Sequence, residues 1–537
     1  MQSRTSSYDE LQKSFRWSVP TRFNIAEATV ERHVGRGRTA LIYDTGSGPA
    51  RELSYDDLSA GSNRLANALE GLGVAQGDRV SIFLSNRPES VLTHVAAWKL
   101  GAISQPLTTL FGPDALRQRL GDAGPKVIVC EPDGRELLID EVLPQLDEEP
   151  LVVCVDDHGP LGFDTLVAAA SDRPRMHDTA ADDPAFLSFT SGTTGPAKGA
   201  LHAHRSLLGH LPGVELAYDL YPRGGDIGWT PADWSWIGGF MDAVFPTLYH
   251  GLPIIAAPRR FDPDEAWAIA ARHGVTYAFL PATAMRMLQQ AHSADTPTTA
   301  FRAIGSGGEK LSDDTKTFFA ERVGCVVNEF YGQTEVNMVI SECAALFEAR
   351  PGSMGRPVPG HEVAILDEDL QPVADDEPGE ICVRADTPVA FLEYFNQPEA
   401  TAKKVVDGWI LTGDVGSRDA DGYLRFSARN DDVISSAGYR IGPGEIEDCL
   451  ARHDAVALAA AIGVPDATRG EVVKAFVELL PGREPGAELR ADIQAHVRRN
   501  LAAYLYPREI EFVEAIPLTT TGKVKRSELR EQELAGR

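Results

Sequence analysis

The sequence predicts an α/β protein with a large N-terminal domain of parallel sheets plus a β-rich subdomain, and a small, mobile C-terminal α/β domain. Apolar, β-branched runs alternate with helical patterns early in the chain, and strand-like segments separated by turn residues follow later. The length of 537 residues is also too great for one compact core. We therefore expect several domain-sized units.

The parallel sheet is predicted from the alternation itself. RVSIFLSN (79–86) has a strand pattern and ESVLTHVAAWKLGA (89–102) has a helix pattern. Further strand patterns lie at 126–133 and 151–157. Strands that alternate with helices favour a parallel sheet. The β-rich subdomain is predicted from the strand-like segments 362–368, 379–385 and 422–428.

The main domain boundary is predicted near Asn430. Residues 428–447 are crowded with Gly, Asp and Asn between a strand pattern and a helix pattern, where a chain can change direction. We therefore predict an N-terminal domain over 1–429 and a C-terminal domain over 430–537. The second has strand and helix patterns of its own, enough for a small α/β domain.

Composition excludes several classes of protein. With 43% hydrophobic and 24% charged residues the chain resembles a soluble globular protein. The first twenty residues lack the apolar run of a secretory signal, and no stretch is long and apolar enough to cross a membrane. We expect a cytoplasmic protein. The six scattered cysteines fit reduced core thiols better than disulfides or zinc ligands.

The net charge of −27 disfavours a nucleic-acid-binding surface, because it repels a phosphate backbone. An anionic ligand must then bind at a local basic or amide-rich site. Only eleven residues are lysines, so a lysine inside a glycine-rich loop is less expected by chance.

Such a loop lies in FLSFTSGTTGPAKG (186–199), directly after an apolar strand pattern. Its glycines let the backbone approach a ligand, its amides and hydroxyls can donate to phosphate oxygens, and its lysine adds a charge. The residues concerned are Thr190, Ser191, Gly192, Thr193, Thr194, Gly195 and Lys198. A flexible Ser/Gly turn is the alternative. GxxxxGK[ST] cannot be aligned here, and no GxGxxG follows a strand.

This segment resembles TSGTTGxPKG of the adenylate-forming superfamily, which comprises acyl-CoA synthetases, peptide-synthetase adenylation domains and luciferases. Pro196 and Ala197 stand in the reverse of the usual order. Other motifs of the family recur in the expected order up to Lys523, and the chain is most similar to the acetyl- and medium-chain acyl-CoA synthetase group.

The resemblance implies a nucleotide site in GSGGEKL (305–311) and NEFYGQTE (328–335). Glu329 would accept from the adenine amino group, Tyr331 would stack on adenine, and Thr334 would bond the α-phosphate. Glu335 would hold Mg²⁺, as suits a hard carboxylate ligand. The remaining nucleotide-binding residues of these two segments would be Gly307, Gly308, Glu309, Phe330, Gly332 and Gln333.

The same resemblance assigns residues nearer the C-terminus. Asp414 and Arg429 would hold the ribose hydroxyls, and Arg440 would approach the phosphate. Asp431 matches the hinge position, and Gly438 would line the coenzyme A channel.

Lys523, in PLTTTGKVKRSELR (517–530), matches the lysine that enters the active site during adenylation. Without the family resemblance, Lys523 and its basic neighbours would be interpreted as a solvated basic patch. It is also a plausible target for a lysine acyltransferase, since acylation would remove its charge.

The implied reaction consumes a carboxylic acid, ATP and coenzyme A, with Mg²⁺ as cofactor. The acid attacks the α-phosphorus, pyrophosphate leaves, and the coenzyme A thiol then displaces AMP from the acyl-adenylate. The catalytic residues implied are Lys523, Glu335, Thr334 and Lys198. No general base is needed, because the acid is already ionised at neutral pH.

The acyl site is assigned from WTPADWSWIGG (229–239), which resembles TADxGWxxG of acetyl- and medium-chain acyl-CoA synthetases. Trp236, Ile237 and Gly238 would line it, together with Gly307 and Gly332. Acetate-specific relatives have larger residues at the three glycine positions, so we expect space for a short- or medium-chain, branched or aryl acid. Three alternative functions stay open: an acetyl-CoA synthetase, an enzyme that loads a carrier protein, and a non-enzymatic nucleotide binder. Assembly into a homo-oligomer also stays open.

Overall fold

The computed structural model describes residues 7–190, 197–309, 311–429, 432, 434–436, 439–466, 470–501, 505–519 and 523–536. They fall into two compact units. The first comprises the residues up to Thr190, Ala197–Val363 and Val383–Ile410, and the second comprises Ala364–Cys382 and the chain from Leu411 onwards. Each unit is described below by itself.

The first unit contains a seven-stranded sheet among the described residues, in the order β18-β8-β7-β4-β3-β5-β6. The strands are β18 (Glu393–Tyr394), β8 (Gly199–Ala203), β7 (Pro184–Phe189), β4 (Ile103–Leu107), β3 (Arg79–Phe83), β5 (Val127–Cys130) and β6 (Leu151–Cys154). The run from β7 to β6 is parallel, β8 pairs antiparallel with β7, and β18 forms the edge, antiparallel to β8. The predicted strands at 79–86, 126–133 and 151–157 are confirmed as β3, β5 and β6.

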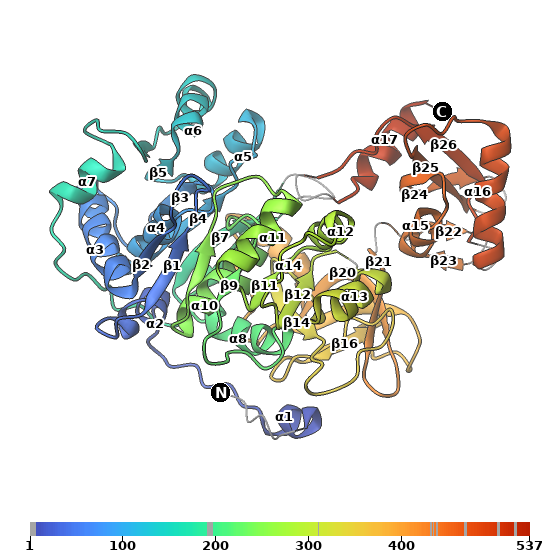
Figure 1. The fold of residues 1–537 in the computed structure, drawn as a ribbon, viewed down its shortest axis with the longest axis horizontal. Coiled ribbons are helices and arrows are strands. Elements are labelled where there is room, and N and C mark those ends of the chain that lie inside the picture. Colours follow the sequence, from blue (N-terminus) through green and yellow to red (C-terminus); the bar gives the residue numbers. More distant parts are fainter. Residues whose placement is uncertain are drawn as a thin grey trace. The chain divides into compact units, whose positions relative to one another are not determined.

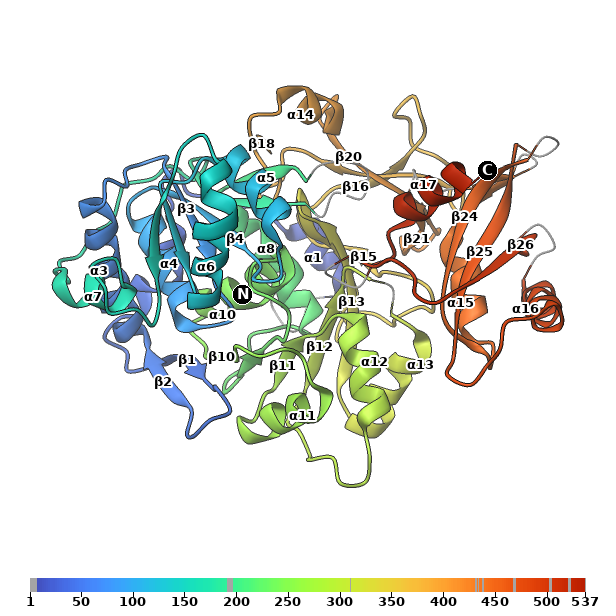
Figure 2. The same cartoon turned by 90° about the horizontal axis from the view of Figure 1, so that it is seen from above.

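A second, nine-stranded sheet of the described residues has the order β15-β14-β13-β12-β11-β9-β10-β1-β2. Figure 1 labels β14, β12, β11, β9, β1 and β2 of this sheet. Its strands are β15 (Arg356–Pro357), β14 (Val336–Ser341), β13 (Val326–Gln333), β12 (Ala303–Gly307), β11 (Tyr277–Phe279), β9 (Gly228–Trp229), β10 (Ile254–Ala256), β1 (Thr39–Tyr43) and β2 (Arg51–Ser54). Strands β13 to β1 are parallel, and β14 turns back antiparallel on β13. Figure 2 shows β11, β12 and β13 side by side.

Helices connect and cover these sheets, as expected for parallel strands. They are α1 (Tyr8–Ser14), α2 (Ile25–Thr29), α3 (Tyr55–Gly71), α4 (Pro88–Lys99), α5 (Pro113–Ala123), α6 (Pro132–Leu137), α7 (Phe163–Ala169), α8 (Ser206–Ala217), α9 (Ile237–Gly239), α10 (Phe245–Tyr249), α11 (Pro263–Arg272), α12 (Ala282–Ala291), α13 (Asp313–Phe318) and α14 (Pro398–Lys404). Helix α4 confirms the predicted helix at 89–102. Its Trp98 is fully buried and donates from Nε1 to the Ala185 carbonyl at 2.7 Å, which fastens the helix to β7.

The second unit contains two further groups of strands. The predicted β-rich subdomain corresponds to β16 (Val363–Leu366), β17 (Gly379–Arg384), β20 (Trp409–Arg418) and β21 (Leu424–Arg429). The chain passes between the two units inside β16, β17 and β20. The other strands are β22 (Ile434–Ser436), β23 (Tyr439–Ile441), β24 (Val456–Asp466), β25 (Gly470–Leu479) and β26 (Glu509–Val513), and the helices are α15 (Pro443–Ala451), α16 (Ala487–Asn500) and α17 (Arg526–Gly536).

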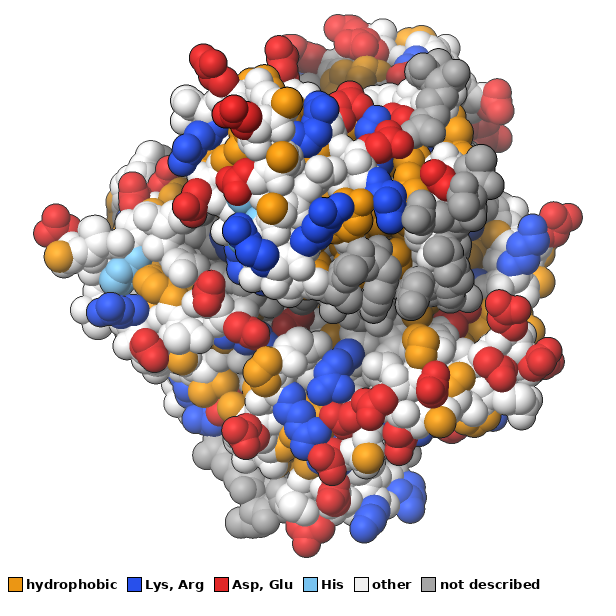
Figure 3. Space-filling model, turned by 90° about the vertical axis from the view of Figure 1, so that its right-hand side faces the viewer, with side chains coloured by type: hydrophobic (Ala, Val, Ile, Leu, Met, Phe, Trp, Pro, Cys, Tyr) orange, Lys and Arg blue, Asp and Glu red, His pale blue; other side chains and the backbone are white. Residues whose placement is uncertain are grey.

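The mixed α/β class is therefore confirmed, while the boundary near Asn430 stays a prediction. Asn430 and the proposed hinge residue Asp431 lie outside the described residues. All six cysteines are buried. No helix in the described part of the chain is long and apolar enough to cross a membrane. On the face drawn in Figure 3, acidic, basic and apolar side chains are interspersed.

Candidate active site

The turn between β13 and β14 holds two predicted site residues. Gln333 pairs with Val336, so Thr334 and Glu335 form the two-residue connection. Glu335 is buried, and its carbonyl accepts from the Phe391 N–H at 2.9 Å. Because β13 is the last of the parallel strands, this turn lies at the carboxyl end of the parallel sheet, where open α/β sheets bind ligands.

Tyr394 joins this turn to the glycine-rich segment. Its hydroxyl donates to Glu335 Oε1, and Lys198 Nζ lies 5.2 Å from the centre of its ring. Tyr394 is held there because β18 pairs with β8, opposite Ala200. Lys198, which is predicted to bind phosphate, and Glu335, which is predicted to bind a metal ion, thus both contact Tyr394. Sequence reasoning missed Tyr394, since nothing local marks that residue among other aromatic ones.

Hydrogen bonds join the two end residues of the glycine-rich segment, Thr190 and Lys198. The Thr190 N–H donates to the Lys198 carbonyl at 2.9 Å, and the Lys198 N–H donates to Thr190 Oγ1 at 3.3 Å. Strands β7 and β8 are antiparallel on either side, with Phe189 opposite Gly199. Both predicted end residues therefore lie together. The predicted phosphate-binding residues Ser191, Gly192, Thr193, Thr194 and Gly195 lie outside the described residues.

The predicted adenine-binding residues lie on β12 and β13 and in the turn after β12. Side chains alternate along β13, so Glu329 and Tyr331 share one face and Phe330 has the other. Glu329 Oε2 lies 3.1 Å from Lys316 Nζ, and burial raises the pKa of Glu329 to about 7 although Lys316 opposes the rise. Glu309 accepts from Thr283 Oγ1 at 2.8 Å. Gly308 has φ +82°, which glycine adopts without strain.

Phe330 was assigned to the nucleotide, but its ring packs towards the predicted acyl residues. A methyl group placed at Gly307 would come within 2.5 Å of the Phe330 ring, and one at Gly238 within 2.8 Å of the Phe279 ring. One at Gly332 would collide with the backbone N–H of Met338. Rings and hairpin backbone therefore lie directly against all three glycines, and the expectation of space for a longer acid remains a prediction. Their place in the acyl pocket stays a prediction.

The remaining acyl residues begin helix α9. Trp236 precedes the helix, is half-buried, and packs edge-on against Phe111 at 6.0 Å between ring centres. Ile237 and Gly238 form the first turn of the helix. The N–H of Trp236 donates to the Asp233 carbonyl at 3.1 Å, which fixes the entry of the chain into the helix.

The second unit brings together two residues that were predicted as a pair. Asp414 and Arg429 lie opposite each other on antiparallel β20 and β21, and Arg429 Nε lies 3.2 Å from Asp414 Oδ1. Arg440 lies on β23. Gly438 lies outside the described residues.

Lys523 is exposed and lies on a backbone turn just before helix α17. Its N–H donates to Thr519 Oγ1 at 3.0 Å, and its carbonyl accepts from the Thr519 N–H at 2.7 Å. Asp432, next to the predicted hinge residue, binds Arg526 and Arg530 of α17 at 3.2 and 2.8 Å. These ion pairs fix the start of α17 to the residue beside the predicted hinge.

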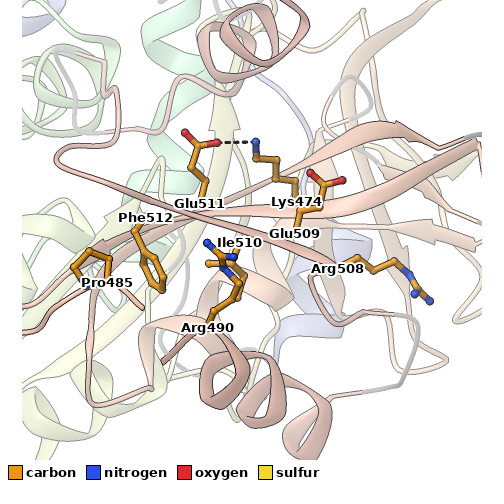
Figure 4. Close-up of a pocket in the computed structure, with 8 residues that line it drawn as sticks. All are labelled: Lys474, Pro485, Arg490, Arg508, Glu509, Ile510, Glu511 and Phe512. Carbon is orange, nitrogen blue, oxygen red and sulfur yellow. Dashed lines mark ion pairs between the residues drawn. The ribbon is translucent and has the colours of Figure 1, made fainter. Parts of the chain in front are cut away.

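The second unit also contains a pocket of about 570 Å³, whose lining residues are drawn in Figure 4. It is lined by Lys474, Pro485, Arg490, Arg508, Glu509, Ile510, Glu511 and Phe512. None of the predicted site residues is among these described lining residues. Two of these lining residues, Lys474 and Glu511, form an ion pair 2.7 Å long (Figure 4).

Comparison with known proteins identifies the family. The model of the AMP-binding enzyme family matches residues 27–395, and that of the AMP-binding enzyme C-terminal domain matches residues 445–523. The chain belongs to the AMP-binding enzyme family. The first matched segment contains the turn of Glu335, and the second ends at Lys523.

Relatives of this AMP-binding enzyme match over nearly the whole chain. The acyl-coenzyme A synthetase ACSM3, mitochondrial, of Rattus norvegicus is 33% identical over 98% of this chain and 93% of its own. The acetyl-coenzyme A synthetase of Bacillus subtilis is 31% identical over 98% and 95%. The crystal structure of the anthranilate CoA ligase AuaEII in complex with anthranoyl-AMP is 29% identical over 96% and 99%, with a TM-score of 0.85.

Proposed function

We propose that this protein is an AMP-forming acyl-CoA synthetase, which converts a carboxylic acid, ATP and coenzyme A to acyl-CoA, AMP and pyrophosphate through an acyl-adenylate. The observation that carries the proposal is the meeting of Lys198, Tyr394 and Glu335 between the glycine-rich segment and the β13–β14 turn. A lysine and a carboxylate placed there suit a Mg²⁺-bound polyphosphate. The full-length similarity to acyl-CoA synthetases supports the same reaction.

Glu335 fits a Mg²⁺ ligand, since it offers a buried carboxylate oriented by the Tyr394 hydroxyl. Mg²⁺ commonly uses one or two carboxylates and completes its shell with phosphate oxygens and water. When bound, the ion neutralises phosphate charge. Thr334 then donates to the α-phosphate, and Lys198 draws the outer phosphates towards the end of the loop.

The nucleotide is proposed to lie along β12 and β13, with Asp414 and Arg429 on its ribose and Arg440 near its phosphate. In-line attack by the carboxylate depends on positioning and charge neutralisation, to which Lys523 contributes. The thioester step is proposed to follow rotation about Asp431, which brings the loop of Gly438 to the coenzyme A thiol. Lys523 is exposed, so a lysine acyltransferase could reach it. We also propose that the protein is cytoplasmic.

The test is a pyrophosphate-release screen with ATP and Mg²⁺ against C2 to C10, branched, sulfur-containing and aromatic acids. We expect release with short- or medium-chain, branched or aryl acids, and a product of acyl-CoA mass after addition of coenzyme A. AMP release that depends on coenzyme A separates the proposal from loading of a carrier protein and from nucleotide binding alone. Absence of pyrophosphate with every acid would contradict it.

Tyr394→Phe is expected to reduce adenylation about tenfold and to raise the Mg²⁺ concentration needed for half-maximal rate. The hydroxyl that orients Glu335 is lost, and such outer partners of a metal ligand typically contribute ten- to a hundredfold. Initial rates of pyrophosphate release at varied Mg²⁺ measure the effect. Tyr55→Phe is the control, since within the described part of the chain its buried hydroxyl donates to backbone carbonyls alone, including that of Leu252 at 2.9 Å. An unchanged Mg²⁺ dependence in Tyr394→Phe would exclude this role.

A further inference from the structure

A buried polar pair lies in the middle of the first unit. Asp242, in the short π-helical turn η4 (Phe240–Val244), is 2% exposed, and Asn337, on β14, is 4% exposed. Asn337 Nδ2 donates to Asp242 Oδ1. Within the described residues, Asn337 is the one side chain that donates to this carboxyl, whereas the Tyr218 hydroxyl donates to the backbone carbonyl of Asp242.

This pair adjoins the predicted acyl residues on two sides. Asp242 follows Gly238 by one helical turn, so both lie on the same face of their helix. A methyl group placed at Gly238 would lie 3.7 Å from Asp242 Oδ2, and one placed at Gly332 would lie 2.6 Å from Asn337 Oδ1. Two glycines that were predicted to line the acyl pocket, Gly238 and Gly332, therefore lie next to these two polar side chains.

Aromatic rings complete the surroundings. Phe279 lies against Gly238, Phe330 lies against Gly307, and the two ring centres are 5.7 Å apart. All three predicted acyl glycines are thus linked through one set of contacts, in which Asp242 and Asn337 are the polar side chains among the neighbours named here. An acyl chain bound beside these glycines would meet the polar pair.

The chemistry of the pair follows from its burial. Asp242 is buried and no cation pairs with it among the described residues, so an ionised carboxylate is unfavourable there and the neutral carboxyl is favoured. Loss of hydration accordingly raises the pKa of Asp242 well above its ordinary value. Its Oδ1 accepts from Asn337, which leaves the proton on Oδ2, the oxygen near Gly238. A hydrocarbon chain would leave this buried O–H without an acceptor, which is unfavourable. A hydroxyl on the chain would accept from it and could donate to Asn337 Oδ1.

We infer that Asp242 and Asn337 determine specificity in the acyl site, and that the substrate is a carboxylic acid with a hydroxyl substituent on its acyl chain. The inference rests on the proposed function and narrows its substrate. Sites that hydrogen-bond a substrate hydroxyl discriminate strongly against analogues that lack it, because their own polar groups are then left unpaired.

The test compares straight-chain acids of three to eight carbons with hydroxy acids of the same lengths, using kcat/KM for pyrophosphate release. For at least one length we expect the wild type to prefer the hydroxy acid tenfold or more. Asp242→Leu should lower that ratio at least tenfold, because it removes the hydrogen-bonding group. Asp242→Asn should keep it, since an amide accepts from Asn337 and donates as the neutral carboxyl does. Asp242→Ala replaces the leucine variant if that protein does not fold.

Asp226→Asn is the matched control. Asp226 is buried too and binds Arg302 at 2.9 Å, but it precedes β9 at the amino end of the parallel strands. It should lower thermal stability and leave the ratio unchanged. A wild type without any hydroxyl preference, or equal losses for both acids in Asp242→Leu, would show that the pair only locks the hairpin to η4 and would overturn the inference. Loss of the preference in Asp242→Asn would overturn the assignment of a neutral, donating carboxyl, because an ionised Asp242 would then recognise the hydroxyl. Absence of pyrophosphate with all acids would instead contradict the proposed function.

Discussion

Lys523→Ala is expected to slow acyl-adenylate formation at least a hundredfold while leaving the conversion of a supplied acyl-adenylate to acyl-CoA nearly unchanged. Removing a charge that stabilises the transition state at phosphorus costs on the order of 3 kcal/mol, which corresponds to at least about a hundredfold in rate. Lys523 belongs to the second unit, whereas Lys198 and Glu335 belong to the first. It can therefore be present in one half-reaction and absent from the other.

Both half-reactions should be measured separately, by pyrophosphate release and by acyl-CoA formation from the adenylate. Lys525→Ala is the control, because it removes a neighbouring charge that pairs only with Glu528, at 3.5 Å, within the described residues. Asp431→Pro gives the reciprocal pattern, with the thioester step slowed more than adenylation, since proline restricts rotation at the hinge. Equal losses in both steps for Lys523→Ala would contradict the alternating roles of the second unit.

Glu335→Gln is expected to abolish adenylation almost completely. The amide has nearly the same volume and still accepts from the Tyr394 hydroxyl, but it lacks the negative charge that a Mg²⁺ ligand supplies. Pyrophosphate release should be followed over a wide range of Mg²⁺ concentrations, together with thermal unfolding to verify that the buried site still folds.

Glu393→Gln is the matched control for that variant. Glu393 is exposed on β18 next to Tyr394, so the same charge is removed close by without touching the proposed ligand. It should retain nearly full activity. Normal pyrophosphate release by Glu335→Gln at ordinary Mg²⁺ would remove Glu335 from the metal site.

Much of this organisation was available from local pattern. The alternation of apolar strands and helices predicted β3, α4, β5 and β6, because each element is determined largely by its own periodicity. The motifs and their order predicted the family, and the pairing of Asp414 with Arg429 was expected before the strands were known to be neighbours. Each of these features is encoded in a short stretch of sequence, so it can be predicted without knowing what the rest of the chain packs against it.

Contacts between distant segments were decided only by the tertiary structure. Tyr394 meets Glu335 because β18 pairs with β8, and no local pattern reports that pairing. The neighbours of the glycines at 238, 307 and 332 were likewise not available from the sequence, and the fold supplies Phe279, Phe330 and the β13–β14 hairpin there. The space beside a glycine is set by whichever side chains pack there, and those come from elements far along the chain. For the same reason Asp242 and Asn337 became a pair only once η4 and β14 were packed together.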